Sequence, residues 1–127
     1  MAHILLIEDE QQVRGLLRET LEQEGHEVVE CKDGTEGLRN YKKGLTDLVI
    51  LDVLLPEKDG FETLRELKQQ DPQVNVLAIS GGFAPGAANI LQIALRLGAR
   101  EVLAKPFDLK SFQTVVNHLL TVPETSV

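Results

Sequence analysis

Short apolar runs alternate with amphipathic stretches along the chain. Residues 3–7 form the first continuous run, which is typical of a strand covered on both faces in a parallel sheet. The following stretch has leucines at helical spacing between charged residues and ends at Gly25, a favourable residue just after a helix. The same couplet recurs to the end of the chain. Later strands are expected at 28–29, 48–51, 74–79 and 102–104, and later helices around Leu38 and Tyr41, around Leu64 and Leu67, at about 88–97 and at 109–120.

Five βα units of this kind predict an α/β fold, with a mostly parallel sheet and helices on both of its faces. The helix starts carry matching chemistry. Two acidic pairs, Asp33 with Glu36 and Asp59 with Glu62, have the spacing of a capping box. Asp108 is suited to cap the last helix in the same way.

Composition and charge narrow the class of protein. The 127 residues carry 13 Lys and Arg against 20 Asp and Glu, a formal net charge of −7, which argues against direct binding to nucleic acid. No apolar run is long enough for a signal peptide or a membrane span, so the expected location is the cytoplasm. The single cysteine, Cys31, is expected to be a small buried hydrophobic residue. We expect one domain over residues 1–122, a flexible tail at 123–127 and no effector domain.

Ionisable and polar side chains are concentrated where the predicted strands end. In open α/β sheets, functional groups gather outside the carboxyl ends of the strands. The residues at these ends are Glu8, Asp9 and Glu10 after the first strand, Asp52 at the third, Ser80 at the fourth and Lys105 at the fifth. We therefore expect the functional site at this edge of the sheet.

The acidic residues would converge if the first and third strands are neighbours. Two carboxylates about 5 Å apart repel by roughly 3 kcal/mol at an effective dielectric constant of about 20. Magnesium held by carboxylates and water would offset that repulsion, and Lys105 adds a fixed positive charge. A hydroxyl such as that of Ser80 could then hydrogen-bond a phosphoryl group. The pattern favours a site in which Asp52 is a nucleophile toward phosphorus.

The same motifs resemble the receiver domain of bacterial two-component response regulators. They are, in order, residues 4–10 (ILLIEDE), residues 48–56 (LVILDVLLP) followed by Asp59-Gly60, then Ser80, then Lys105-Pro106-Phe107. The resemblance covers nearly the whole chain. It implies a flavodoxin-like, doubly wound (βα)5 fold with a five-stranded parallel sheet of order 2-1-3-4-5.

The resemblance also implies a function. Asp52 would accept a phosphoryl group from the phosphohistidine of a histidine kinase or from a phosphotransfer protein. Lys105 would contact that group through a side chain placed by a cis bond to Pro106, and Ser80 would be the hydroxyl that moves on phosphorylation. The chain would be a signalling phosphoacceptor that catalyses its own phosphotransfer and slow dephosphorylation, and not an enzyme acting on other molecules.

Magnesium is the cofactor that the resemblance implies. Asp9 and Asp52 would bind Mg²⁺ directly, and Glu8, where many members have Asp, would act mainly through water. The backbone carbonyl of Leu54 would be the remaining protein ligand.

The chain departs from the family at two places. Val102 stands where the family usually has an aromatic residue three positions before the lysine, and an aliphatic side chain cannot make the rotation of that ring on activation. Residues 81–86, rich in glycine, lengthen the segment after the fourth strand. Our hypothesis is that this loop, carrying Phe83, reports phosphorylation in place of the missing ring.

The helix at about 88–97 is apolar on more than one face. Ile93, Ala94 and Leu97 are expected to line the core, while Leu91 and Leu95 form a second stripe. That stripe is either part of a broad core contact or a surface for a partner. The partner would be a downstream protein target, or a second copy in a homodimer formed through the fourth and fifth helices.

Three other functions share the architecture. An aspartyl phosphatase of the haloacid-dehalogenase type needs a second acid two residues after its nucleophile, where this chain has Leu54. A flavodoxin-like flavin carrier needs a loop that cradles a phosphate, whereas Glu8, Asp9 and Glu10 would repel it. A receiver-shaped interaction module without phosphotransfer is the third alternative, and it leaves the intact set of site residues without a role.

Overall fold

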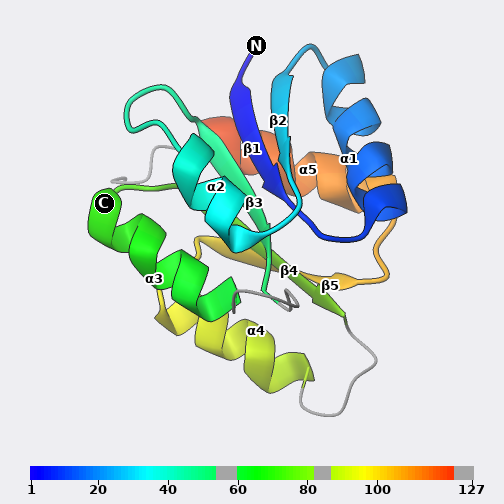
Figure 1. The fold of residues 1–127 in the computed structure, drawn as a ribbon. Helices are drawn as coiled ribbons and strands as arrows, with labels where there is room; N and C mark the ends of the chain where they lie inside the picture. Colours follow the sequence, from blue (N-terminus) through cyan, green and yellow to red (C-terminus); the bar gives the residue numbers. More distant parts are fainter. Residues whose placement is uncertain (54–59, 82–86, 122–127) are drawn as a thin grey trace.

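A computed structural model describes residues 1–53, 60–81 and 87–121 of the chain. Strands and helices alternate from one end to the other (Figure 1). In chain order the elements are β1 His3–Ile7, α1 Gln11–Gln23, β2 Glu27–Cys31, α2 Gly34–Asn40, β3 Leu48–Asp52, α3 Gly60–Gln70, β4 Val76–Gly81, α4 Ala87–Arg96, β5 Glu101–Lys105 and α5 Leu109–Thr121.

The five strands form one parallel sheet in the order β2-β1-β3-β4-β5. The predicted flavodoxin-like topology is thereby confirmed. Strands β1 and β3 are neighbours, with Ile7 opposite Leu51, and strands β4 and β5 are paired up to Gly81 opposite Lys105. The carboxyl ends of all these strands therefore lie at one edge of the sheet.

Helices cover both faces of the sheet (Figure 1). Helices α1 and α5 lie on one face, and α2, α3 and α4 lie on the other. Alternate residues of β1 serve the two layers: Ile4 and Leu6 pack with α1 and α5, whereas Leu5 and Ile7 pack with the other helices. Burial on both faces explains why the central strands are continuously apolar in sequence.

Helix caps follow the predicted chemistry where the structure describes them. Gly25 follows α1 with φ of +88°, a backbone conformation that glycine adopts without steric cost. The Asp33 carboxylate accepts from the Glu36 amide at 2.9 Å, and that of Asp108 accepts from the Ser111 amide at 2.7 Å. The expected cap Asp59 and the expected tail at 123–127 lie outside the described residues.

Two predicted element bounds differ from the structure. Helix α2 ends at Asn40, and Tyr41 is extended so that its hydroxyl reaches Asp71, donating at 2.6 Å. Strand β4 begins at Val76 and not at Val74, whose amide instead closes a turn onto the Asp71 carbonyl at 3.0 Å. Asp71 takes part in both places, through its buried carboxylate at Tyr41 and through its main-chain carbonyl at Val74.

The prediction that Ile93 lines the core is wrong. Ala94 of α4 is fully buried, and Ile90 and Leu97, four before it and three after it, pack against the same core. Ile93 and Leu95 are 42% and 38% exposed, on the side away from the sheet. Among the helices of the described residues, none combines the length and the apolar character that a membrane span requires.

Gly60 allows α3 to start directly against the end of β3. A Cβ at this position would overlap the backbone of Val53. We expect Gly60→Ala to lower the free energy of unfolding by about 1–3 kcal/mol, because the backbone of β3 must shift to admit a methyl group. Urea unfolding measures the change.

Gly15→Ala is the matched control, since a Cβ at Gly15 in the exposed middle of α1 meets nothing within 4 Å. This variant is expected to raise the free energy of unfolding by about 0.5–1 kcal/mol. A Gly60→Ala protein as stable as the native chain would contradict the close approach.

Candidate functional site

Three carboxylates meet at the carboxyl edge of the sheet. Glu8 and Asp9 follow β1, and Asp52 is the last residue of β3, so the pairing of these strands brings them together. One carboxylate oxygen from each lies within 4.8 Å of the others. Glu8 and Asp52 are buried, with 0% and 4% of their surface exposed, whereas Asp9 is exposed. The convergence expected from the strand ends is therefore present.

Lys105, the last residue of β5, binds two of these carboxylates. Its Nζ donates to Oε1 of Glu8 at 2.7 Å and to Oδ2 of Asp52 at 3.1 Å. The other carboxylate oxygen of Glu8 accepts from the main-chain amide of Glu10 at 3.1 Å. The bond from Lys105 to Pro106 is cis, as expected. The ammonium thus bridges the ends of β1 and β3.

Burial sets the charge states of this group. It raises the pKa of Glu8 to about 7; the hydrogen bond from Lys105 opposes this shift, and the charge of Asp52 adds to it. Burial alone would lower the pKa of Lys105, but the hydrogen bond with Glu8 and the charge of Asp52 outweigh it and raise this pKa above its ordinary value. At neutral pH the lysine is charged, and Glu8 is near the midpoint of its titration.

Ser80 lies in β4, in register with Ala104 and one position before the pair formed by Gly81 and Lys105. The residue is fully buried, and within the described part of the chain its Oγ has no hydrogen-bond partner. An unpaired buried hydroxyl is costly, and such a group in a native protein calls for an explanation. Its place near the end of β4 puts it at the same edge as the carboxylates.

The remaining predicted residues fall in different places. Val102, in β5, is half-buried and packs against the core beneath α2, α3 and α4. Leu54 and Phe83 lie outside the described residues. The magnesium ligand expected at the Leu54 carbonyl and the reporting loop expected around Phe83 therefore stay predictions.

The donor set suits a small, hard divalent cation. Carboxylate oxygens are the ligands that Mg²⁺ prefers, and it is commonly held by one or two carboxylates together with water. Glu8, Asp9 and Asp52 supply three such groups, and the ammonium of Lys105 contacts two of them. The residues present thus fit magnesium by charge and by chemistry.

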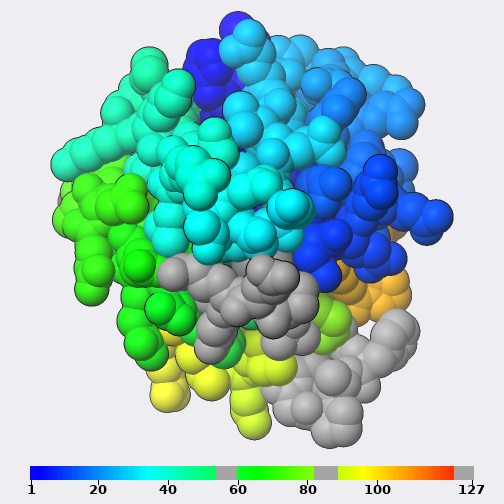
Figure 2. Space-filling model, viewed as in Figure 1, coloured from blue at the N-terminus to red at the C-terminus, as the bar shows by residue number. Residues whose placement is uncertain are grey.

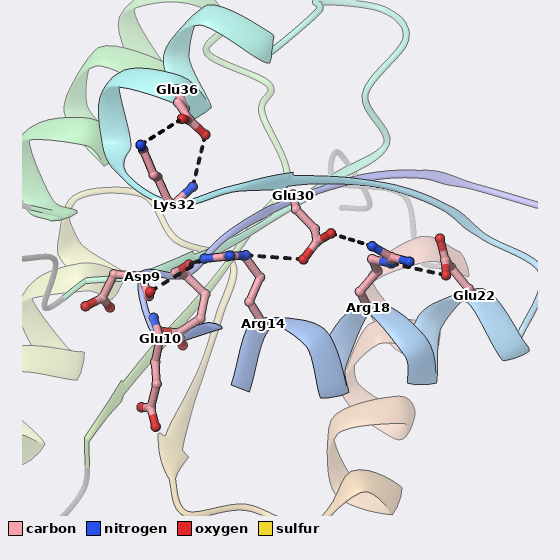
Figure 3. A network of polar contacts seen from close by, with 9 residues as sticks. Asp9, Glu10, Arg14, Arg18, Glu22, Glu30, Lys32 and Glu36 are labelled. Carbon is pink, nitrogen blue, oxygen red and sulfur yellow. Dashed lines mark hydrogen bonds and ion pairs between the residues drawn. The ribbon is translucent and has the colours of Figure 1, made fainter. Parts of the chain in front are cut away.

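One residue of the site was missed in the sequence. Arg14, in the first turns of α1, donates through Nη1 to the main-chain carbonyl of Glu8 at 2.8 Å and through Nε to Glu30 at 3.2 Å (Figure 3). Its distance from Glu8 along the chain was compatible with contact. Nothing in the sequence, however, distinguishes it from the other arginines.

The edge that carries the site is formed by segments far apart in the chain. In the space-filling view, the blue residues that follow β1 adjoin the cyan residues that follow β2, and α3 and α4 continue the same face (Figure 2). Together, the sheet order and the acidic cluster define a doubly wound α/β protein with a charged site at the carboxyl ends of its strands.

The chain belongs to the response regulator receiver domain family, whose profile matches residues 4–117. It is 34% identical over 122 residues to the chemotaxis protein CheY of Bacillus subtilis (strain 168), covering 94% of this chain and 99% of that protein. It is 32% identical over 117 residues to the alkaline phosphatase synthesis transcriptional regulatory protein PhoP of the same organism, covering 92% of this chain and 48% of that protein. The chain therefore spans nearly the whole length of one relative and about half of the other.

A solved structure gives the same result. A response regulator receiver domain protein from Clostridium thermocellum superimposes with a TM-score of 0.86 at 31% identity, over 94% of each chain. Receiver domains are signalling phosphoacceptors of two-component systems, and they interact with histidine kinases or phosphotransfer proteins. They typically bind Mg²⁺ in an acidic pocket, and this chain has an acidic cluster formed by Glu8, Asp9 and Asp52.

The raised pKa of Glu8 predicts a specific dependence of stability on pH. The pKa rises from 4.5 to about 7, so the folded state holds this proton more tightly than the unfolded state does. The contribution of Glu8 to stability is full below about pH 4.5 and is lost as the pH rises toward about 7. We expect Glu8→Gln to remove this loss, so that the variant gains stability relative to the native chain between pH 5 and pH 7.5.

Urea unfolding at both pH values, in EDTA, measures this difference. Glu10→Gln makes the same change of charge on an exposed neighbour and serves as the control. An equal difference between native and Glu8→Gln proteins at the two pH values would show that Glu8 does not titrate in this range.

Proposed function

We propose that Asp52 accepts a phosphoryl group from the phosphohistidine of a histidine kinase or a phosphotransfer protein, in a magnesium-dependent reaction. One observation carries this proposal: a nearly buried carboxylate at the end of β3 is bound by Lys105 and lies within 4.8 Å of two further carboxylates. A site for a cation and a phosphoryl group gives these mutually repelling acids a role.

Asp52, Lys105 and Ser80 would each have a different role in such a transfer. An oxygen of Asp52 bonds to phosphorus while the bond from phosphorus to the histidine nitrogen breaks, and the nitrogen keeps the electron pair. Lys105, positioned by its bonds to Glu8 and Asp52, pairs with the negative charge on the transferring group. The hydroxyl of Ser80 supplies a hydrogen bond to a phosphoryl oxygen, which would give this buried group a partner.

Asp9 and Asp52 are the proposed direct magnesium ligands, and Glu8 acts through water. The hydrogen bonds of Glu8 support the indirect role, because one carboxylate oxygen accepts from Lys105 and the other accepts from the amide of Glu10. The carbonyl of Leu54 is a further proposed ligand. Bound magnesium would neutralise charge on the phosphoryl group during transfer.

Output through protein contact is the second part of the proposal. Ile93 and Leu95 of α4 are large apolar side chains in partly exposed positions, as a surface for a downstream protein or for a second copy of the chain would have. The names of the relatives cover both chemotaxis and transcriptional regulation. Proteins that share this domain therefore have different outputs, and each is expected to act on a target of its own.

Incubation with acetyl phosphate and Mg²⁺, followed by intact mass measurement, tests the phosphoacceptor role. The native chain is expected to gain one phosphoryl group, and Asp52→Asn is expected to gain none because an amide oxygen is a poor nucleophile. EDTA should abolish the gain. Equal labelling of native and Asp52→Asn proteins would place the acceptor elsewhere, and no labelling of either would contradict the proposal.

Ser80→Ala separates a functional hydroxyl from a structural one. The hydroxyl has no partner among the described residues, so its removal is expected to change the free energy of unfolding by less than about 0.5 kcal/mol. Phosphorylation by acetyl phosphate is expected to slow about tenfold through the loss of one hydrogen bond to the phosphoryl group.

The initial rate of mass gain and urea unfolding give the two measurements. A variant that is phosphorylated at the native rate would contradict the role of Ser80 in transfer. Thr20→Val is the control, because the buried hydroxyl of Thr20 does have a partner, the Leu16 carbonyl at 2.9 Å, and lies on α1 away from the site.

A further inference from the structure

The guanidinium of Arg14 connects the acidic loop after β1 with strand β2 (Figure 3). Nη1 donates to the carbonyl of Glu8 at 2.8 Å and approaches that of Asp9 at 3.5 Å, while Nε donates to Oε1 of Glu30 at 3.2 Å. The side chain of Arg14 is only 17% exposed. One cation therefore contacts two consecutive main-chain carbonyls of the loop and is itself held by a carboxylate of β2.

These two carbonyls belong to the peptide groups on either side of the Cα of Asp9. The amide of Glu8 is also fixed, because it donates to the carbonyl of Cys31 at the end of β2, at 3.0 Å. The carboxylate of Asp9, by contrast, is exposed and has no hydrogen-bond partner within the described residues. Within the described residues, the position from which that carboxylate extends is therefore held by main-chain contacts and not by a bond of its own.

Glu30 is a firm anchor for this arrangement. Its second oxygen accepts from Nη1 of Arg18 at 2.6 Å, and Nε of Arg18 donates to Glu22 at 3.3 Å. The bond from Arg18 lowers the pKa of Glu30, which keeps the anchor ionised. Arg14 and Arg18 lie one turn apart on α1 and share Glu30, but of the two only Arg14 reaches the loop carbonyls.

We propose that Arg14 is a positioning residue for the magnesium site: through the carbonyls of Glu8 and Asp9 it fixes the backbone that directs the Asp9 carboxylate toward Asp52. The inference rests on the proposed function of that site. Groups that orient metal ligands typically change metal affinity by about 10- to 100-fold.

A positioning role and a purely electrostatic role predict opposite results. Arg14 is a cation in contact with the main chain of Glu8 and Asp9, so it repels a divalent ion that binds at their carboxylates. If charge alone mattered, its removal would strengthen the binding of magnesium. If Arg14 holds the loop, its removal weakens that binding in spite of the lost repulsion. The sign of the change decides between the two.

Isothermal titration calorimetry of the full chain with Mg²⁺ measures this sign. We expect Arg14→Gln to weaken magnesium binding about tenfold. Arg18→Gln is the matched control, because it makes the same change of charge one turn away and removes a bond to the same Glu30. We expect its affinity to stay within about twofold of the native value. Unchanged or tighter binding by Arg14→Gln, or an equal loss in both variants, overturns the proposal.

Two further variants keep the test valid if Arg14→Gln does not fold. Arg14→Lys preserves the charge, but an ammonium cannot present a planar fork to the Glu8 carbonyl and to Glu30 at once, so we expect binding to be weakened about fivefold. Native affinity in this variant would show that charge suffices, and would overturn the proposal. Glu30→Gln leaves Arg14 in place with a weaker anchor, and we expect a loss of about twofold to fivefold.

Phosphorylation by acetyl phosphate separates this inference from the proposed function. A native chain that binds magnesium but gains no phosphoryl group contradicts the proposed function alone, because the comparison of affinities still stands. A native chain that does not bind magnesium contradicts both. A native chain that is phosphorylated, with Arg14→Gln and Arg18→Gln alike in affinity, contradicts only the role of Arg14.

Discussion

The carboxyl edge of the sheet carries more negative charge than the lysine in contact with it can balance. Glu8, Asp9 and Asp52 come within reach of one another, and Lys105 is the ammonium bonded to two of them. Two of the three carboxylates are buried, where an uncompensated charge is far more costly than in water. The protein relieves part of this cost by holding the proton of Glu8 to a higher pH than usual. What remains is an attraction for an external cation.

The apolar core is what keeps this arrangement from relaxing. Strands β1 and β3 are buried on both faces, so the residues just before the acids, Ile7 and Leu51, are locked in register between two helical layers. Separating the strands to spread the charges would expose apolar surface, which costs a free energy of about 25 cal/mol per Å². The fold therefore imposes the repulsion of the carboxylates.

Much of this edge could be predicted because the sequence indicates where the central strands end. Continuous apolar runs mark the central strands, and the residues that follow them must lie at the same edge. The edge strand β2 was harder to predict. Its exposure alternates along Glu27–Cys31, so the apolar pattern indicated a strand only at residues 28–29. The order of the strands came from the family resemblance, because periodicity does not say which strands pair.

The particular hydrogen bonds between distant residues could not be predicted from the sequence. Glu8 and Lys105 are 97 positions apart, and in the folded chain the ammonium lies closer to Glu8 than to Asp52. Ile93 was misplaced for a related reason: an apolar helix offers several faces at helical spacing, and packing against the sheet selects the one that contains Ala94. The sequence pattern indicates that a helix forms, and tertiary packing determines which of its faces is buried.

The two cations at the site differ in what they bind. Lys105 contacts carboxylate oxygens, which are the groups that would change charge or bond in the proposed transfer, and a flexible ammonium can move its hydrogen bonds as they change. Arg14 contacts main-chain oxygens and a carboxylate of β2, none of which takes part in the proposed chemistry. A planar guanidinium is suited to that task because its donors point in fixed directions. Under the proposed function, the site combines a mobile charge beside the phosphoryl group with a rigid charge beside the magnesium ligands.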